Sequence, residues 1–476
     1  MFIHVSGLRV ICFLSFWGFM ANGFSQEISQ MGQNFPAGEI TEKVLCQEEP
    51  DRSYALYLPK GYDPKNSYAL VLIFEPISRA TLPLEKMQQA ADHFGIILAC
   101  SWDTYNMNDF RDNIASAKAM WMDVATRFSV DTNRTYTSGF SGGARLASEI
   151  AIVTGTIAGH IGCGAGLRNT THTNKTIPFS IALVIGNQDM NVMELTDLDR
   201  KLSFTKSTHR LFIFEGGHEW PSPEVFMEVF GWLNVQAMRS KLLPHDAAFI
   251  QAQWEKDLNE AQRFINAQDY LEAQRLYERM AHDYITLRDT THASDLANEL
   301  RKNPDYKEGL QRKMRLENAE KMRQRRYVQD LRKQGSTLPS ELEEYQKLLR
   351  PWIQEKQRQD EHILKTKFQD ERLMAQRLID FAWRMSIERS MNLYASGSYR
   401  EALFLALLST VYVPEYSYPF ILVAKCYAQL DSPKEALIFL ERALDLGVNQ
   451  PERLAEDPAF VKLYGSPKYQ ELFKGD

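Results

Sequence analysis

Short apolar runs alternate with amphipathic segments between about residues 51 and 238. The run Tyr68–Phe74 is apolar throughout, which is typical of a strand buried on both faces of a sheet. Alternation of this kind predicts an α/β fold, in which helices cover both faces of a mostly parallel sheet. Further strands are predicted at 54–58, 96–100, 134–138, 161–163, 179–185 and 210–214, and helices at 84–94, 109–128, 144–154 and 223–238.

The pattern changes after about residue 241, where strand-like runs give way to long, charged helical segments. A helical hairpin is predicted at 254–266 and 270–280. Residues 287–382 are rich in Arg, Lys, Glu and Gln with sparse apolar positions, which favours solvated helix faces. Acidic residues interleave with the basic ones, and this argues against a nucleic-acid-binding arm. The second half is therefore predicted to be all-α, with a break at 335–339.

An internal repeat marks the C-terminal part of the chain. The segment 398–403 recurs 34 residues later at 432–437, and 34 residues is the period of a tetratricopeptide helix pair. Residues 269–273 look like a further, degenerate copy. This part resembles tetratricopeptide arrays, and the resemblance implies a concave surface for a protein or peptide partner. The alternative is that these helices simply pack on the first half of the chain.

The N-terminus has the layout of a secretory signal peptide. His4 and Arg9 precede an apolar run at residues 10–20, and small and polar residues follow it. Cleavage is expected after Ser25, so the mature protein is expected to be exported, either to the periplasm or outside the cell. An uncleaved signal that anchors the chain is the alternative, although the run is short for a membrane span. No other long apolar stretch occurs, so no stable span is expected after cleavage.

Composition narrows the possible partners. The formal net charge of −6 gives no support to nucleic-acid binding. Outside the signal segment the cysteines are widely separated and form no Cys-x-x-Cys, which argues against a disulfide framework or a zinc site. Cys100 and Cys163 fall in apolar runs and are expected to be core residues. Neither a metal nor a cofactor is expected.

Candidate chemistry centres on Ser141 in the pattern Gly-x-Ser-x-Gly. The pattern falls between a predicted strand and a predicted helix, which is the strand–turn–helix context that an exposed nucleophilic serine needs. A serine hydroxyl is a poor nucleophile unless a base removes its proton. The first half must therefore supply a base and a group that orients it.

Two side chains meet this demand at the ends of later strands. Asp189 is the first acid after the strand 179–185, and His218 follows the strand 210–214 on a Gly-flanked loop. Because active residues of parallel sheets lie at the carboxyl ends of strands, Ser141, Asp189 and His218 are predicted to meet there. Asp197 and Asp199 lie on the helix expected after Asp189 and are the weaker candidates for the acid.

These motifs resemble those of the α/β-hydrolase superfamily. The most specific part is Gly-Gly-His-x-Trp-Pro at residues 216–221, and the likeness covers about residues 45–240. The set looks most like the secreted esterase branch, which includes polyhydroxyalkanoate depolymerase-like and feruloyl-esterase-like proteins. The resemblance implies Ser141 as nucleophile, His218 as base and Asp189 as orienting acid. It also implies the Gly142 backbone N–H as one donor to the oxyanion.

The sequence departs from the superfamily after the strand Tyr68–Phe74. A His-Gly pair usually begins the loop that gives the second oxyanion donor, but this chain has Glu75-Pro76. Proline has no N–H to donate, so the donor is expected to be Ile77, with Ser78 as the alternative. Losing such a donor would cost about 2.7–4 kcal/mol of transition-state stabilisation, so a weak or specialised enzyme remains open.

Three aromatic residues are candidates for contact with a substrate, namely Trp102, Tyr105 and Trp220. Ordinary packing of these rings is the alternative. The leading interpretation is an exported serine hydrolase that cleaves carboxylic esters of a small molecule or polymer. The alternatives are a tetratricopeptide-containing binding or scaffold protein with a weak or inactive hydrolase domain, and a serine peptidase. The expected divisions are a signal peptide at 1–25, the hydrolase domain at 26–242, a charged helical region at 243–385 and the repeat domain at 386–476.

Overall fold

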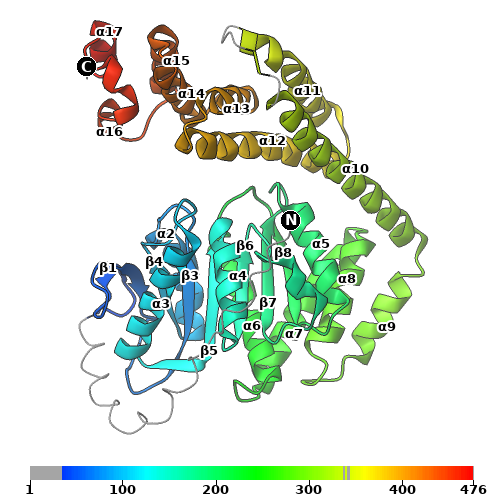
Figure 1. Cartoon of the computed structure of the whole chain (residues 1–476). Coiled ribbons are helices and arrows are strands. Elements are labelled where there is room, and N and C mark those ends of the chain that lie inside the picture. The colour runs from blue at the N-terminus through cyan, green and yellow to red at the C-terminus, as the bar shows by residue number, and fades with distance from the viewer. Residues whose placement is uncertain (1–34, 336–337, 340–343, 475–476) are drawn as a thin grey trace, which may run out of the picture.

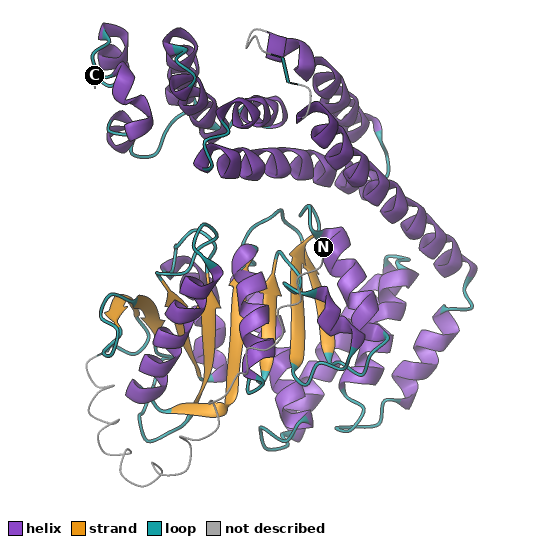
Figure 2. Ribbon diagram, viewed as in Figure 1, coloured by secondary structure: helices purple, strands orange, loops and turns teal. Residues whose placement is uncertain are grey.

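The computed structural model describes residues 35–335, 338–339 and 344–474, and within them eight strands form one sheet (Figures 1 and 2). The predicted signal peptide lies outside these residues. The strand order is β1-β2-β4-β3-β5-β6-β7-β8. Strand β2 is antiparallel to both of its neighbours, and the six strands from β3 to β8 are parallel to one another. The strands are β1 Ile40–Leu45, β2 Ser53–Tyr57, β3 Tyr68–Phe74, β4 Ile96–Ser101, β5 Val130–Phe140, β6 Gly159–Cys163, β7 Ser180–Gly186 and β8 His209–Phe214.

Helices cover both faces of the sheet. Helices α2 (Thr81–Phe94) and α6 (Pro223–Arg239) pack on one face. Helices α3 (Phe110–Arg127), α4 (Gly142–Thr154) and α5 (Val192–Ser203) contribute to the clusters on the other face. The predicted α/β-hydrolase fold is confirmed by this architecture. The sequence did not predict β1, because this edge strand is largely solvent-exposed and its polar residues hide the apolar alternation.

Three helices extend the first half beyond the boundary predicted at residue 242. They are α7 (Ala247–Asn266), α8 (Tyr270–Asp283) and α9 (Thr291–Leu300), and they share a hydrophobic cluster with Val235 of α6. On the edge strand β8, Arg210 forms ion pairs of 2.9 Å with Asp257 and 3.7 Å with Asp283. The hairpin predicted at 254–280 corresponds to α7 and α8. These helices therefore pack against α6 and β8 of the sheet-bearing part through a hydrophobic cluster of their own.

The long helix α10 (Pro304–Gly335) leads away from α9 to a second, helical region (Figure 1). In the described residues beyond α9 this region is helical and contains no strand, as predicted. The repeat positions Ala402 and Ala436 are both fully buried, but the tetratricopeptide assignment remains a prediction. The other helices are α11 Tyr345–Lys365, α12 Gln369–Ala395, α13 Tyr399–Tyr412, α14 Ser417–Gln429, α15 Pro433–Asp445, α16 Pro451–Ala455 and α17 Pro467–Leu472, with short 3₁₀ helices at Thr170–Asn174 and Pro458–Leu463.

Helix α12 crosses the carboxyl ends of the strands, so the helical region lies above that edge of the sheet (Figures 1 and 2). The N-terminal part of α12 contacts the loop after β7, where Arg377 donates to the carbonyl oxygen of Asn187 at 2.8 Å. Along the described ranges we find no helix with the length and apolar character of a membrane span.

Through His160 in β6, the stability of the fold depends on pH. It is fully buried, with Nδ1 3.2 Å from Thr137 Oγ1. Burial removes water from the imidazolium and lowers the pKa of His160 from 6.5 to about 3. Because the folded pKa lies below the unfolded one, unfolding takes up a proton below pH 6.5. The stability that this neutral histidine provides above that pH is therefore lost as the pH falls toward 3.

We expect His160→Gln to flatten this acid dependence. The variant removes a slope of up to about 1.4 kcal/mol per pH unit in the free energy of unfolding. Urea unfolding of both proteins at a series of acidic pH values measures the two slopes. Identical slopes would show that His160 titrates alike in the folded and unfolded chains.

Candidate active site

Ser141 lies at a strained turn between β5 and α4. Its backbone has φ 52° and ψ −119°, a conformation that non-glycine residues rarely adopt. Glycine is required beside it, because a Cβ at residue 143 would lie 2.0 Å from the carbonyl oxygen of Phe74 in β3. This close approach of α4 to β3 holds the turn above the sheet edge. The sequence pattern and the observed turn agree.

The structure brings Ser141, His218 and Asp189 into one hydrogen-bonded series. The distance from Ser141 Oγ to His218 Nε2 is 3.0 Å, and that from His218 Nδ1 to Asp189 Oδ2 is 2.7 Å. Asp189 is fully buried, and its other oxygen accepts from the backbone N–H of Asn191 at 2.8 Å. A carboxylate on Nδ1 fixes the tautomer whose Nε2 can accept the serine proton.

The two rival acids lie elsewhere. Asp197 pairs with Arg200 at 2.9 Å and with Lys321 at 2.6 Å. Asp199 is 3.6 Å from both His209 and Arg275. Both residues therefore form ion pairs at the surface of α5. Among the three acids, only Asp189 contacts His218.

Aromatic packing supports the histidine loop from behind. The ring of Phe140 lies 4.6 Å from that of His218 and 5.5 Å from that of Trp220. Trp220 is only 6% exposed, and its Nε1 is buried without a hydrogen-bond partner among the residues that the structure describes. The expectation that Trp220 offers a wall to the substrate does not fit this burial, because Phe140 and Phe226 pack against the ring. Trp220 instead packs behind the histidine.

The loop after β3 arranges its donors around Glu75. One carboxylate oxygen accepts from the backbone N–H groups of Ile77 at 2.8 Å and Arg79 at 3.1 Å, and the other pairs with the Arg79 guanidinium. The N–H of Ile77, the predicted second oxyanion donor, is therefore engaged within its own loop. In the described residues, the N–H of Gly142 makes no backbone hydrogen bond outside its helix, whereas the bridge between Ile77 and Tyr105 directs the N–H of Ser78 toward the carbonyl oxygen of Thr104. Ser78 also has a strained φ of 59°.

The loop after β4 forms a rim next to the serine turn. Tyr105 pairs with Ile77 in an isolated bridge, and Asn106 N–H donates to the Pro76 carbonyl oxygen at 2.9 Å. A Cβ at residue 142 would lie 1.8 Å from Asn106 Oδ1, which places this rim directly beside Gly142. Tyr105 is 41% exposed and Ile77 63% exposed, so the rim presents apolar surface. The third aromatic candidate, Trp102, instead donates from its indole to the Glu42 carbonyl oxygen at 2.7 Å.

Sequence reasoning missed the contribution of α12. Arg377 forms a buried, bidentate ion pair with Glu320 of α10 at 2.9 and 2.7 Å, besides its bond to Asn187. Asp380 Oδ2 accepts weakly from the N–H of Met190 at 3.4 Å. Both contacts flank Asp189. The many charged side chains in residues 287–382 led to the expectation of solvated helix faces. The feature of the sequence that could have indicated a buried contact is Arg377, which stands among apolar residues of α12.

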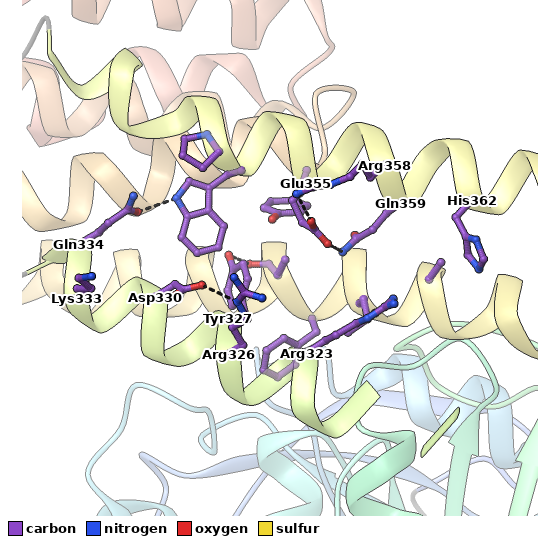
Figure 3. A pocket seen from close by; sticks show the side chains of 17 residues that line it. Arg323, Arg326, Tyr327, Asp330, Lys333, Gln334, Glu355, Arg358, Gln359 and His362 are labelled. Atoms are coloured by element: carbon purple, nitrogen blue, oxygen red, sulfur yellow. Dashed lines mark hydrogen bonds and ion pairs between the residues drawn. The ribbon is translucent and has the colours of Figure 1, made fainter. Parts of the chain in front are cut away.

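A separate cavity of about 840 Å³ lies within the helical region, between α10, α11 and α12 (Figure 3). Its lining includes Tyr327, Trp352 and several basic residues, and Figure 3 shows Arg323, Arg326 and Arg358 around it. In the described chain this lining holds no serine, threonine or cysteine nucleophile. The cavity uses a different face of α12 from that which contacts Asn187. No grouping of three or more metal-binding side chains occurs among the residues that the structure describes.

Comparisons with known proteins show likeness only to solved structures. No protein-family model matches the chain, and no curated protein sequence matches it. A feruloyl esterase module from Clostridium thermocellum is 11% identical at a TM-score of 0.33, over 41% of this chain and 86% of that chain. An esterase from Pyrobaculum calidifontis is 12% identical at 0.33, over 45% and 90%. Esterase 2 from Thermogutta terrifontis is 14% identical at 0.36, over 44% and 98%. Each likeness concerns less than half of this chain.

Proposed function

We propose that this protein is an exported serine hydrolase that cleaves carboxylic esters through an acyl-enzyme. The observation that carries the proposal is the unbroken series Ser141 Oγ, His218 Nε2, His218 Nδ1 and Asp189 Oδ2, with distances of 3.0 and 2.7 Å. These are hydrogen-bond distances, as a nucleophile, its base and the orienting acid require. Export rests on the N-terminal sequence pattern.

The reaction follows from the placement of these groups. Ser141 Oγ attacks the ester carbonyl carbon while His218 Nε2 takes the hydroxyl proton, and Asp189 stabilises the imidazolium. The Gly142 N–H, at the start of α4, donates to the oxygen that becomes negatively charged. Collapse of the tetrahedral intermediate expels the alcohol, which receives the proton from His218. A water molecule then attacks the acyl-enzyme by the same route and releases the acid.

The loop at Glu75 favours one competing interpretation. With the Ile77 N–H bound to Glu75 and the Ser78 N–H directed toward Thr104, the Gly142 N–H is the one expected oxyanion donor that the described residues leave available. A missing donor would lower transition-state stabilisation by about 2.7–4 kcal/mol. A scaffold that binds a protein or peptide through residues 386–476 and has little hydrolase activity is therefore the second candidate function.

Labelling with a fluorophosphonate separates the two. We expect the purified wild-type protein to react covalently at one serine, and Ser141→Ala to abolish the reaction while the variant still folds. The exposed Ser240, at the end of α6, provides the matched control, and Ser240→Ala should label like the wild type. A folded wild-type protein that takes up no label would favour the scaffold.

A further inference from the structure

Helix α12 continues over the catalytic edge beyond its contacts with the Asp189 loop. It is anchored above β7 by the bonds from Arg377 to Asn187 and from Met190 to Asp380. Figure 1 shows the rest of the helix passing above the ends of the central strands, toward the side where α2 and α3 lie. The helix therefore runs from the acid toward the nucleophile.

Helical geometry places Glu388 at the nucleophile end of this path. Residues 377, 380, 384 and 388 follow at intervals of three or four, so they share the face that contacts the sheet-bearing part. At about 1.5 Å per residue, Glu388 lies roughly 12 Å along α12 from Asp380. Adjacent strands are about 4.8 Å apart, so the end of β5, which carries Ser141, lies roughly 10 Å from that of β7.

The electrostatic surroundings of Glu388 agree with this placement. Desolvation by neighbouring protein atoms raises the pKa of its carboxyl group, although Glu388 as a whole residue is solvent-exposed. The charges of His218, Arg384 and Arg145 act in the opposite direction and lower that pKa, whereas the charge of Asp380 raises it further. The charges of the base His218 and of Arg145, in the first turn of α4, therefore both act on the Glu388 carboxyl group.

The neighbouring charges are already neutralised by partners. Arg145 makes a bidentate pair with Glu194 at 2.9 and 2.7 Å, and Arg384 pairs with Asp380 at 2.7 Å. For Glu388 no ion pair or hydrogen bond is present among the residues that the structure describes. The face of α12 that overlooks Ser141 therefore presents one uncompensated negative charge.

We propose that Glu388 is a substrate-binding residue that selects carboxylic esters bearing a cationic group, such as a primary or quaternary ammonium. The inference rests on the proposed function and names the substrate class for that same site. A cation that extends from the Ser141 acyl or alcohol position toward α12 gains a charge partner there. A neutral isostere gains none, and an anion is repelled. The partly solvated position limits the preference to about fivefold to tenfold.

Labelling rates test the inference without knowledge of the natural ester. Two fluorophosphonates are compared, one carrying a trimethylammonium group and the other its neutral tert-butyl isostere. We expect the wild type to react with the cationic probe about fivefold to tenfold faster, and Glu388→Gln to bring the ratio of the two rates close to one. Glu415→Gln, which removes an exposed carboxylate of the loop before α14, should keep the wild-type ratio.

The outcomes separate this inference from the proposed function. If neither probe labels Ser141 in the folded protein, the hydrolase assignment fails and takes the inference with it. If both probes label Ser141 at equal rates, or the ratio is the same in wild type and Glu388→Gln, the hydrolase assignment stands and the role of Glu388 is wrong. Circular dichroism of both variants confirms that the compared proteins are folded.

Discussion

Asp189→Asn is expected to lower the kcat for ester hydrolysis by about 10⁴-fold while the fold stays intact. An asparagine keeps the size of the side chain, and its oxygen can still accept from the N–H of Asn191. Its amide nitrogen, however, would donate to His218 Nδ1 and stabilise the tautomer that carries its proton on Nε2. A protonated Nε2 cannot accept the proton of Ser141. Steady-state hydrolysis of an activated aryl ester measures the loss.

The rival acids of the sequence provide the matched controls for this prediction. Asp197 and Asp199 lie on α5, ten residues or fewer beyond Asp189, and form ion pairs away from His218. Asp197→Asn is expected to stay within about twofold of the wild-type kcat, since exposed ion pairs contribute at most about 1 kcal/mol. A small loss for Asp189→Asn together with a large loss for Asp199→Asn would move the acid assignment to α5.

The constellation of Ser141, Asp189 and His218 could be predicted because each residue is marked by local sequence. Each follows a recognisable apolar strand, and parallel strands necessarily bring their carboxyl ends to one edge. Long-range information was needed only to know that the strands share a sheet, which their alternation with helices supplies. The same reasoning fails for β1, where the solvent-exposed edge weakens the apolar alternation.

Contacts made by side chains across the chain could not be predicted in this way. The engagement of the Ile77 N–H depends on how the Glu75 carboxylate turns within its loop, and the sequence gives only the two residue types. The burial of Trp220 behind His218 depends on Phe140, which is distant in sequence. The bond from Arg377 to Asn187 joins residues 190 positions apart, and only the folded chain places them together.

The bond from Arg377 to Asn187 indicates that the helical region also holds the loop that carries Asp189. Arg377 is nearly buried and holds three partners at once, namely the two oxygens of Glu320 and the carbonyl oxygen of Asn187. Asn187 lies two residues before Asp189. The position of α12 is therefore coupled mechanically to the loop that carries the acid of the proposed triad.

Arg377→Met is expected to destabilise the protein by about 3–5 kcal/mol, because it leaves the Glu320 carboxylate buried without its partner. Thermal and urea unfolding measure this loss. We also expect kcat to fall by about tenfold to a hundredfold, since small displacements of a catalytic group carry costs of that size. A loss of activity alone could reflect either the damaged fold or the displaced acid loop.

The double variant Glu320→Leu/Arg377→Met separates these two causes. Replacement of a buried ion pair by apolar side chains of similar volume is often neutral or stabilising, so the free energy of unfolding should recover. The bond to the Asn187 carbonyl oxygen is still absent, and kcat should therefore stay low. Recovery of stability without activity would establish Arg377 as a residue that positions Asp189. Recovery of both would show that the ion pair only holds α10 and α12 together, and that the hydrolase site is independent of the helical region at this point.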